Sequence, residues 1–225
     1  MAFKRMILGV FTLGATALAV PAFASFHLMQ IEQVIGGVNG DTSRQAIQLR
    51  MRSPGQQFVN FGRLRAWDAA GANPVLLIDM TVQVANGNTG DRVLVATANF
   101  LPGLTPDFVM QPIPASYLPA GKITWEDDGG TIWWGFAWGG AAYTGTNTGV
   151  NAAGGGNDAD GNFNPPFAAV LPSTNTLAVR FTGAATALST NNAADYALTA
   201  GAAQFTNNTG QNGTVPVDLM ELKVQ

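Results

Sequence analysis

Residues 44–52 read Arg-Gln-Ala-Ile-Gln-Leu-Arg-Met-Arg. Apolar side chains alternate with polar ones in the second part of this stretch, which is Ile47, Gln48, Leu49, Arg50, Met51 and Arg52. A period of two is typical of a β-strand, because successive side chains point to opposite faces of a sheet. The stretch therefore predicts a strand with one apolar face and one solvated face.

Other parts of the chain resemble this strand. Met220, Leu222 and Val224 alternate with polar residues and predict a closing strand. Further candidates, most of them bounded by the turn residues Gly, Pro, Asn or Asp, are 26–35, 62–68, 74–82, 91–98, 122–126, 131–138 and 176–182. A short helical turn is expected around Asn192–Leu198, capped by Asn191 or Asn192. Because the sequence indicates no helix longer than this turn, the pattern predicts an all-β sandwich.

The N-terminus has the three parts of a secretory signal peptide. Lys4 and Arg5 precede an apolar run of 15 residues from Met6 to Val20, and the small residues Ala22 and Ala24 follow it. A transmembrane anchor needs about 20 apolar residues, so cleavage after Ala24 is the preferred interpretation. We expect residues 1–24 to be a signal peptide, residues 25–225 to form one domain without a membrane span, and the protein to be secreted, periplasmic or on the cell surface.

Composition excludes several kinds of function. The sequence has no cysteine, so disulfides, thiolate metal sites and a lipoprotein anchor are impossible. Charged residues are only 11% of the 225, and removal of Lys4 and Arg5 with the signal leaves nine basic and fourteen acidic residues, a net charge of −5. Such a chain is not expected to bind nucleic acid, and no cofactor is expected.

The order of motifs resembles the lamin-tail domain. The segments that carry the resemblance are Leu28–Val34 with Gly40-Asp41 and Ala46–Leu49, then Gly62–Asp68, Gly90–Ala96 and Asn192–Leu198. Gln48 stands where the family has Glu, and Tyr196 where it has Trp. The resemblance covers residues 26–200 with an insertion at roughly 110–175. It implies an immunoglobulin-like β-sandwich that serves as an interaction module of exported bacterial proteins, with no catalytic residues.

Catalytic groups are few. None of the serines lies in a Gly-x-Ser-x-Gly elbow, and the single histidine, His27, cannot supply a metal site alone. The cluster Glu126-Asp127-Asp128 precedes Gly129-Gly130 and is interpreted as a hairpin turn between two strands. Acid–base catalysis by these three carboxyl groups, as in a hydrolase, is the alternative. We expect the protein not to be an enzyme.

Residues 139–166 are rich in Gly and Asn and are expected to form a long loop. Asp158, Asp160 and Asn162 alternate within it and resemble the first half of a calcium loop. When Gly161 is aligned with the loop glycine, the first and last ligand positions fall on Gly156 and Phe167. A flexible loop is therefore the preferred interpretation, and a Ca²⁺ site is the alternative.

Aromatic residues gather at Trp125, Trp133, Trp134 and Trp138. On a strand, Trp134 and Trp138 share a face with Phe136, and Trp133 points the other way. Packing of one set in the core is the preferred interpretation, and an exposed row that binds sugar rings is the alternative. The sequence thus predicts a non-catalytic module that contacts a protein or cell-surface partner, with a carbohydrate-binding module built on these tryptophans as the second hypothesis.

Overall fold

The structure is a computed structural model that describes residues 26–146, 165–189 and 191–216. Each strand predicted within these ranges is confirmed, with ends that differ by a few residues. These strands are β1 (Met29–Ile35), β2 (Ala46–Met51), β3 (Gly62–Trp67), β4 (Val75–Asp79), β5 (Arg92–Ala96), β7 (Gly121–Asp127), β8 (Ile132–Trp138) and β9 (Val179–Phe181). The predicted strand at Met220–Val224 lies outside the described residues.

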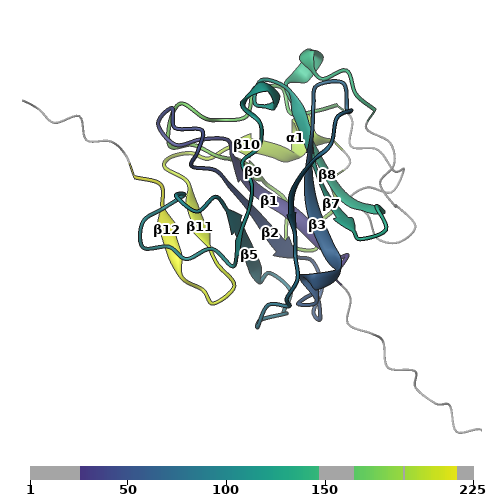
Figure 1. The fold of residues 1–225 in the computed structure, drawn as a ribbon, viewed down its shortest axis with the longest axis vertical. Coiled ribbons are helices and arrows are strands. Elements are labelled where there is room, and N and C mark those ends of the chain that lie inside the picture. The colour runs from purple at the N-terminus through teal and green to yellow at the C-terminus, as the bar shows by residue number, and fades with distance from the viewer. Residues whose placement is uncertain (1–25, 147–164, 190, 217–225) are drawn as a thin grey trace, which may run out of the picture.

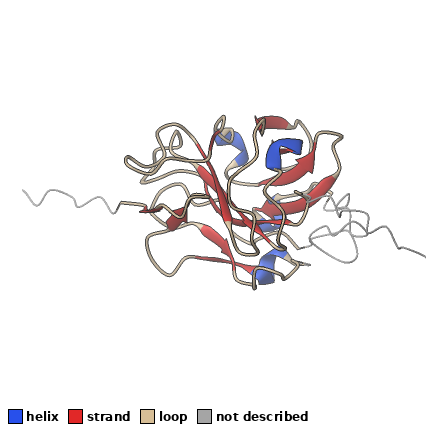
Figure 2. Cartoon of the chain, turned by 90° about the horizontal axis from the view of Figure 1, so that it is seen from below, coloured by secondary structure: helices blue, strands red, loops and turns tan. Residues whose placement is uncertain are grey.

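Four further strands were not predicted. They are β6 (Phe108–Val109), β10 (Tyr196–Leu198), β11 (Gln204–Thr206) and β12 (Asn212–Thr214). Each has only two or three residues, which is too short for a periodic pattern to stand out. The described part of the chain is therefore mostly β-structure with a single short α-helix, and Figure 2 shows the strands in red.

The largest sheet has six strands in the order β10-β9-β1-β2-β5-β6, of which Figure 1 labels all but β6. Neighbouring strands in this sheet are antiparallel, except for β5 and β6, which are parallel to each other. Strand β1 pairs with β2 from Met29↔Met51 to Ile35↔Ala46, and this register is interrupted by a bulge between Ile31 and Gln33. The bulge lies at Glu32 and shapes the candidate site described below.

A second sheet has four antiparallel strands in the order β4-β3-β7-β8. The turn between β7 and β8 confirms the hairpin interpretation of residues 126–130. The Oδ1 atom of Asp127 accepts a hydrogen bond from the Thr131 amide at 2.7 Å, and Gly130 has a φ of 90°. Glycine suits this left-handed conformation because it has no Cβ to clash.

One hydrophobic core joins the two large sheets. Met29, Ile31 and Leu49 of the six-stranded sheet belong to the same buried cluster as Leu64 and Trp134 of the four-stranded sheet. Aromatic rings fill much of it, and Phe136 packs against Tyr196 with ring centroids 4.4 Å apart. The apolar face predicted for residues 44–52 is confirmed, since the side chains of Ile47, Leu49 and Met51 are fully buried.

The opposite face of the six-stranded sheet is partly covered by the β11–β12 hairpin. Phe205 of this hairpin lies in a second buried cluster with Ile35, Leu94 and Phe100, and the rings of Phe100 and Phe205 meet edge to face at 4.9 Å. The face that the alternation predicts to be solvated is therefore covered at one end of the sheet. Gln48 is only 2% exposed, because Thr206 of β11 donates its amide to the Gln48 Oε1 at 2.6 Å.

The short helix α1 (Asn192–Asp195) corrects the length of the predicted helical turn. Asn191 caps it by accepting a hydrogen bond from the Ala194 amide at 3.0 Å, as expected for an N-cap asparagine. The chain then becomes extended at Tyr196, which pairs with Phe181 in β9. Pairing with a neighbouring strand thus ends the helix after one turn.

Strands β7 and β8 lie within residues 110–175, the segment that the lamin-tail resemblance assigns to an insertion. They pair with each other and with β3, and they contribute Trp125, Trp134, Phe136 and Trp138 to the main core. This part of the chain is therefore built into the four-stranded sheet and its core.

Candidate functional site

The β-bulge in β1 places two successive polar side chains on the outer face of the six-stranded sheet, the face turned away from the main core. Ile31 and Val34 both lie in that core, whereas Glu32 and Gln33 between them bond with polar groups on the other face. A bulge adds one residue to a strand and re-aims its side chain. Here it directs Glu32 toward the arginines of neighbouring strands.

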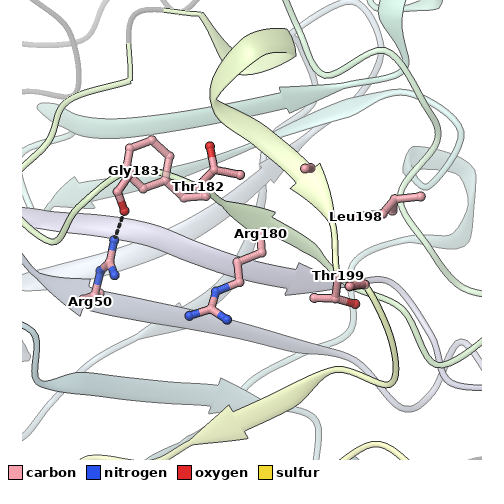
Figure 3. A pocket seen from close by; sticks show the side chains of 9 residues that line it. Arg50, Arg180, Thr182, Gly183, Leu198 and Thr199 are labelled. Carbon is pink, nitrogen blue, oxygen red and sulfur yellow. Dashed lines mark hydrogen bonds between the residues drawn. The ribbon is translucent and has the colours of Figure 1, made fainter.

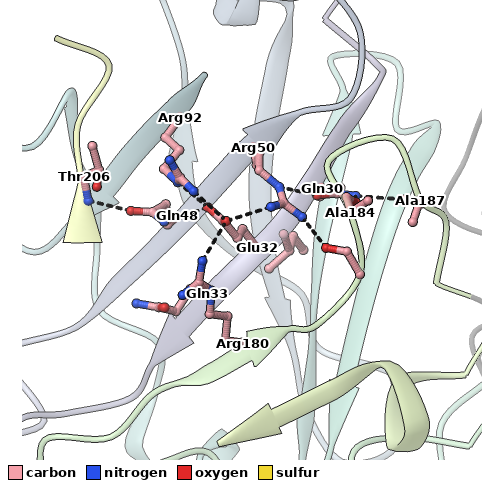
Figure 4. A network of polar contacts seen from close by, with 12 residues as sticks. Gln30, Glu32, Gln33, Gln48, Arg50, Arg92, Arg180, Ala184, Ala187 and Thr206 are labelled. Carbon is pink, nitrogen blue, oxygen red and sulfur yellow. Dashed lines mark hydrogen bonds and ion pairs between the residues drawn. The ribbon is translucent and has the colours of Figure 1, made fainter. Parts of the chain in front are cut away.

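Glu32 is fully buried, and three arginines surround it (Figure 4). Arg92 of β5 contacts both carboxylate oxygens, with its Nε at 2.7 Å and its Nη2 at 3.1 Å. Arg50 of β2 lies at 3.2 Å, and Gln48 donates a hydrogen bond at 2.7 Å. Arg180 of β9 is the most distant, at 3.5 Å. We call these five residues the Glu32 cluster.

The arginines keep Glu32 ionised. Burial alone would raise the pKa of Glu32, but the hydrogen bond from Arg92, the charges of Arg50 and Arg92 and the hydrogen bond from Gln48 together hold it below its ordinary value. An ionised, fully bonded carboxylate has no proton to give and no free oxygen to accept one. Glu32 is therefore an anchor for the surrounding cations and unsuited to acid–base catalysis.

Further hydrogen bonds fix the cluster to the loops around it. Arg50 donates to the Gln30 Oε1 at 2.7 Å and to the Gly183 carbonyl at 2.9 Å. Gln30 in turn donates to the carbonyls of Ala184 and Ala187. The polar face is thus a connected network that holds the chain after β9 in position, and such support is what a precise binding site requires.

A pocket opens beside this network, with a volume of about 390 Å³ (Figure 3). Arg50 and Arg180 line it on the sheet, and β10 with the residues after it contributes Ala197, Leu198 and Ala200. The Arg180 side chain is half exposed, whereas that of Arg50 is only 11% exposed. Arg180 is therefore the cation of the cluster that a ligand in this pocket can reach.

The four tryptophans singled out in the sequence do not form an exposed row. Trp125, Trp134 and Trp138 are fully buried in the main core, which confirms that one set packs inward; on β8 it is the face shared by Trp134, Phe136 and Trp138. Only Trp133 is partly exposed, and its ring packs at a tilt against that of His27, with ring centroids 4.6 Å apart. Stacking on a sugar needs exposed ring faces. Of these residues, only Trp133 has surface for it.

His27, the single histidine, contacts Trp133 near the start of the described chain. Burial lowers the pKa of His27 below its ordinary value of 6.5, and the charge of Arg52 lowers it further. The imidazole is therefore mostly neutral at pH 7.

Glu126 lies in a second cluster on the outer face of the four-stranded sheet. It is 1% exposed and is contacted by Arg63 at 3.2 Å and by Arg65 at 3.6 Å, and it accepts a hydrogen bond from the Thr124 hydroxyl. Asp127 instead caps the hairpin turn. Neighbouring acidic residues therefore have different roles: Glu126 pairs with arginines of β3, and Asp127 holds the hairpin turn.

Asp158, Asp160 and Asn162, the alternative Ca²⁺ ligands, lie outside the described residues. Within residues 26–146, 165–189 and 191–216, no group of three or more His, Asp or Glu side chains is arranged to hold a metal ion. No helix in the described part of the chain is long and apolar enough to span a bilayer.

The Glu32 cluster was missed by reasoning from the sequence, although a signal for it exists. The apolar residues of β1 are two apart at Met29 and Ile31 but three apart at Ile31 and Val34. That change of spacing indicates a bulge, and a glutamate at its centre is unusual in a buried strand. The partners Arg92 and Arg180 come from strands whose order in the sheet the sequence does not reveal.

Comparisons with protein-family models, with curated proteins and with solved structures gave no match.

Proposed function

We propose that this chain is an exported, non-catalytic binding module of lamin-tail type, with its two large sheets arranged as an immunoglobulin-like sandwich. It acts at the cell envelope or outside the cell, through contacts with a protein or a cell-surface partner. The signal-like segment 1–24 supports export, and the order of motifs supports the family. The pocket beside the Glu32 cluster is its binding site.

The observation that carries this proposal is the arrangement of the outer sheet face. Its polar side chains are bonded to one another in a connected network, and an open pocket lies next to a half-exposed arginine. The buried glutamates of both sheets are ion-paired with arginines. Such a face holds a ligand in place without offering a free acid or base for catalysis.

A carbohydrate-binding module built on Trp125–Trp138 is the second hypothesis, and the structure favours it less. Three of its four rings are fully buried, so they have no face to offer a sugar. Replacing Trp133, the remaining ring, by alanine separates the two hypotheses. We expect the W133A variant to bind cell envelopes as the natural chain does, whereas a sugar-stacking module would lose binding.

The first experiment follows export and binding in cells that express the full sequence. We expect N-terminal sequencing of the exported protein to begin at Ser25, and the protein to be retained by washed cell envelopes in a saturable way. The R180E variant should lose most of this retention, and R65E, which changes an arginine of the other sheet, should keep it. Intracellular protein that still carries residues 1–24, or export without saturable retention, would overturn the proposal.

A further inference from the structure

The Glu32 cluster holds more positive charge than its carboxylate balances. Three guanidinium groups surround one carboxylate. Burial lowers the pKa of Arg50, the charge of Glu32 raises it, and the charges of Arg92 and Arg180 lower it again. The arginines thus repel one another, and an added negative charge at this place would relieve the repulsion.

Arg180 is the surplus cation. Arg92 and Arg50 already contact Glu32 at 2.7–3.2 Å, and Arg50 also donates from its Nε to Gln30 and from its Nη2 to Gly183. Among the described residues, the side chain of Arg180 forms one ion pair, with its Nη2 at 3.5 Å from Glu32. Because its side chain is half exposed and lines the pocket, its guanidinium can turn two N–H groups toward a ligand.

Nearby acidic side chains are engaged elsewhere. The Asp195 carboxylate accepts a hydrogen bond from the Asn191 amide at the start of α1. The Asp91 carboxylate accepts one from the Asn88 amide at 2.6 Å, and its charge raises the pKa of Arg92. Among the described residues, the acid that pairs with Arg180 is Glu32, and neither Asp195 nor Asp91 does so.

The remaining pocket wall limits the kind of anion. Thr182 and Thr199 line the pocket, but their hydroxyls already donate to the carbonyls of Asp195 and Gly201. Across the strand pair from Arg180 lies Ala197, and Ala200 also lines the pocket. The side chains of this wall other than the bonded threonines are therefore apolar, and Arg180 supplies the free donors.

We propose that this pocket binds a carboxylate that is attached to an apolar group. A carboxylate has two oxygens in a plane, which match the two parallel N–H groups of one guanidinium. A sulfate or phosphate has further oxygens, which would face Ala197 without donors. The apolar part of the ligand packs against Ala197 and Ala200, which line the pocket with Arg180. This inference rests on the proposed binding function and names the chemistry of its ligand.

The test uses protein purified after expression of the full sequence, with hexanoate as the probe at constant ionic strength. We expect hexanoate to shift the backbone amide NMR signals of Arg180, Ala197 and Thr199 in a saturable way. Hexanamide, which has the same shape without the charge, should not do so. Sulfate should bind at least about tenfold more weakly than hexanoate, because it finds fewer donors.

Two variants make the site assignment specific. R180Q removes the cation, and A197L fills the pocket while Arg180 remains; each should weaken hexanoate binding by at least about tenfold. R65Q is the matched control and should leave it unchanged. Arg180 and Ala197 are exposed enough for both variants to fold, and an unchanged melting temperature verifies this.

Three results would overturn the inference: hexanoate affinity that R180Q leaves within about twofold, equal binding of hexanamide, or sulfate that binds as tightly as hexanoate. Each is distinguishable from failure of the proposed function. Envelope retention without hexanoate binding would leave the function standing and end this inference. Hexanoate binding without envelope retention would end the proposed function and leave this inference standing.

Discussion

Each large sheet buries one glutamate on its outer face, and arginines from neighbouring strands surround both. Glu126 has two arginines and a threonine hydroxyl, and the hairpin acids Asp127 and Asp128 follow it directly. Glu32 has three arginines and a glutamine, and one of its arginines faces a pocket. Both clusters tie strands together, but only the Glu32 cluster keeps a half-exposed cation beside a pocket. The Glu126 cluster therefore stabilises its sheet, whereas the Glu32 cluster also has a cation that a ligand can reach.

The largest expected effect is that of E32Q. The substitution leaves three arginines around a neutral group, and removal of one partner from a buried ion pair typically costs about 3–5 kcal/mol. We expect a decrease of that size in the free energy of unfolding, measured by urea denaturation. A decrease below about 1 kcal/mol, the size of an exposed pair, would show that the Glu32 cluster does not hold the sheet together.

E126Q should have a smaller effect. Glu126 has two ion pairs, with Arg63 at 3.2 Å and Arg65 at 3.6 Å. Glu32 is contacted by Arg92 at 2.7 and 3.1 Å and by Arg50 at 3.2 Å, so fewer and longer contacts are lost in E126Q. We expect a loss of about 1–3 kcal/mol in the same urea measurement, the usual cost of losing hydrogen bonds to a charged group. An equal or larger loss than for E32Q would contradict the proposed difference between the clusters.

The acid side of the stability profile tests the Glu32 cluster in another way. Because the pKa of Glu32 is lower in the folded state than its ordinary value of 4.5, the ion pairs stabilise the fold fully above that pH. The contribution is lost as the pH falls below 4.5 through the folded pKa. Unfolding free energies measured between pH 2 and pH 7 should therefore fall less steeply for E32Q than for the natural chain. Parallel profiles would contradict the pairing.

The fold was largely predictable because the long strands carry local patterns. Alternation gave the strand at residues 44–52 and placed Trp134, Phe136 and Trp138 on one face, and both are confirmed. It could not tell which face of β8 turns inward, since that depends on the other sheet. It also could not give β10, whose three residues become a strand only by pairing with β9.

The candidate site was less predictable because it is assembled from distant segments. Glu32, Arg50, Arg92 and Arg180 lie on β1, β2, β5 and β9, and strand order brings them together. The expectation that Arg50 and Gln48 face solvent failed because the β11–β12 hairpin and the chain after β9 bond to them. No sequence pattern within β2 itself indicates that other segments cover this face.

The smallest expected effect on stability distinguishes Arg180 from its counterpart in the other cluster. Arg63 contacts Glu126 at 3.2 Å and the Asp128 carbonyl at 3.1 Å, so R63Q removes two contacts and should cost about 1–2 kcal/mol. Arg180 has only the 3.5 Å contact and stands near two other cations. R180Q should therefore change the unfolding free energy by no more than about 0.5 kcal/mol, because relief of repulsion offsets the lost attraction. If R180Q were as destabilising as R63Q in urea, Arg180 would be a structural partner of Glu32 rather than a cation left available to a ligand.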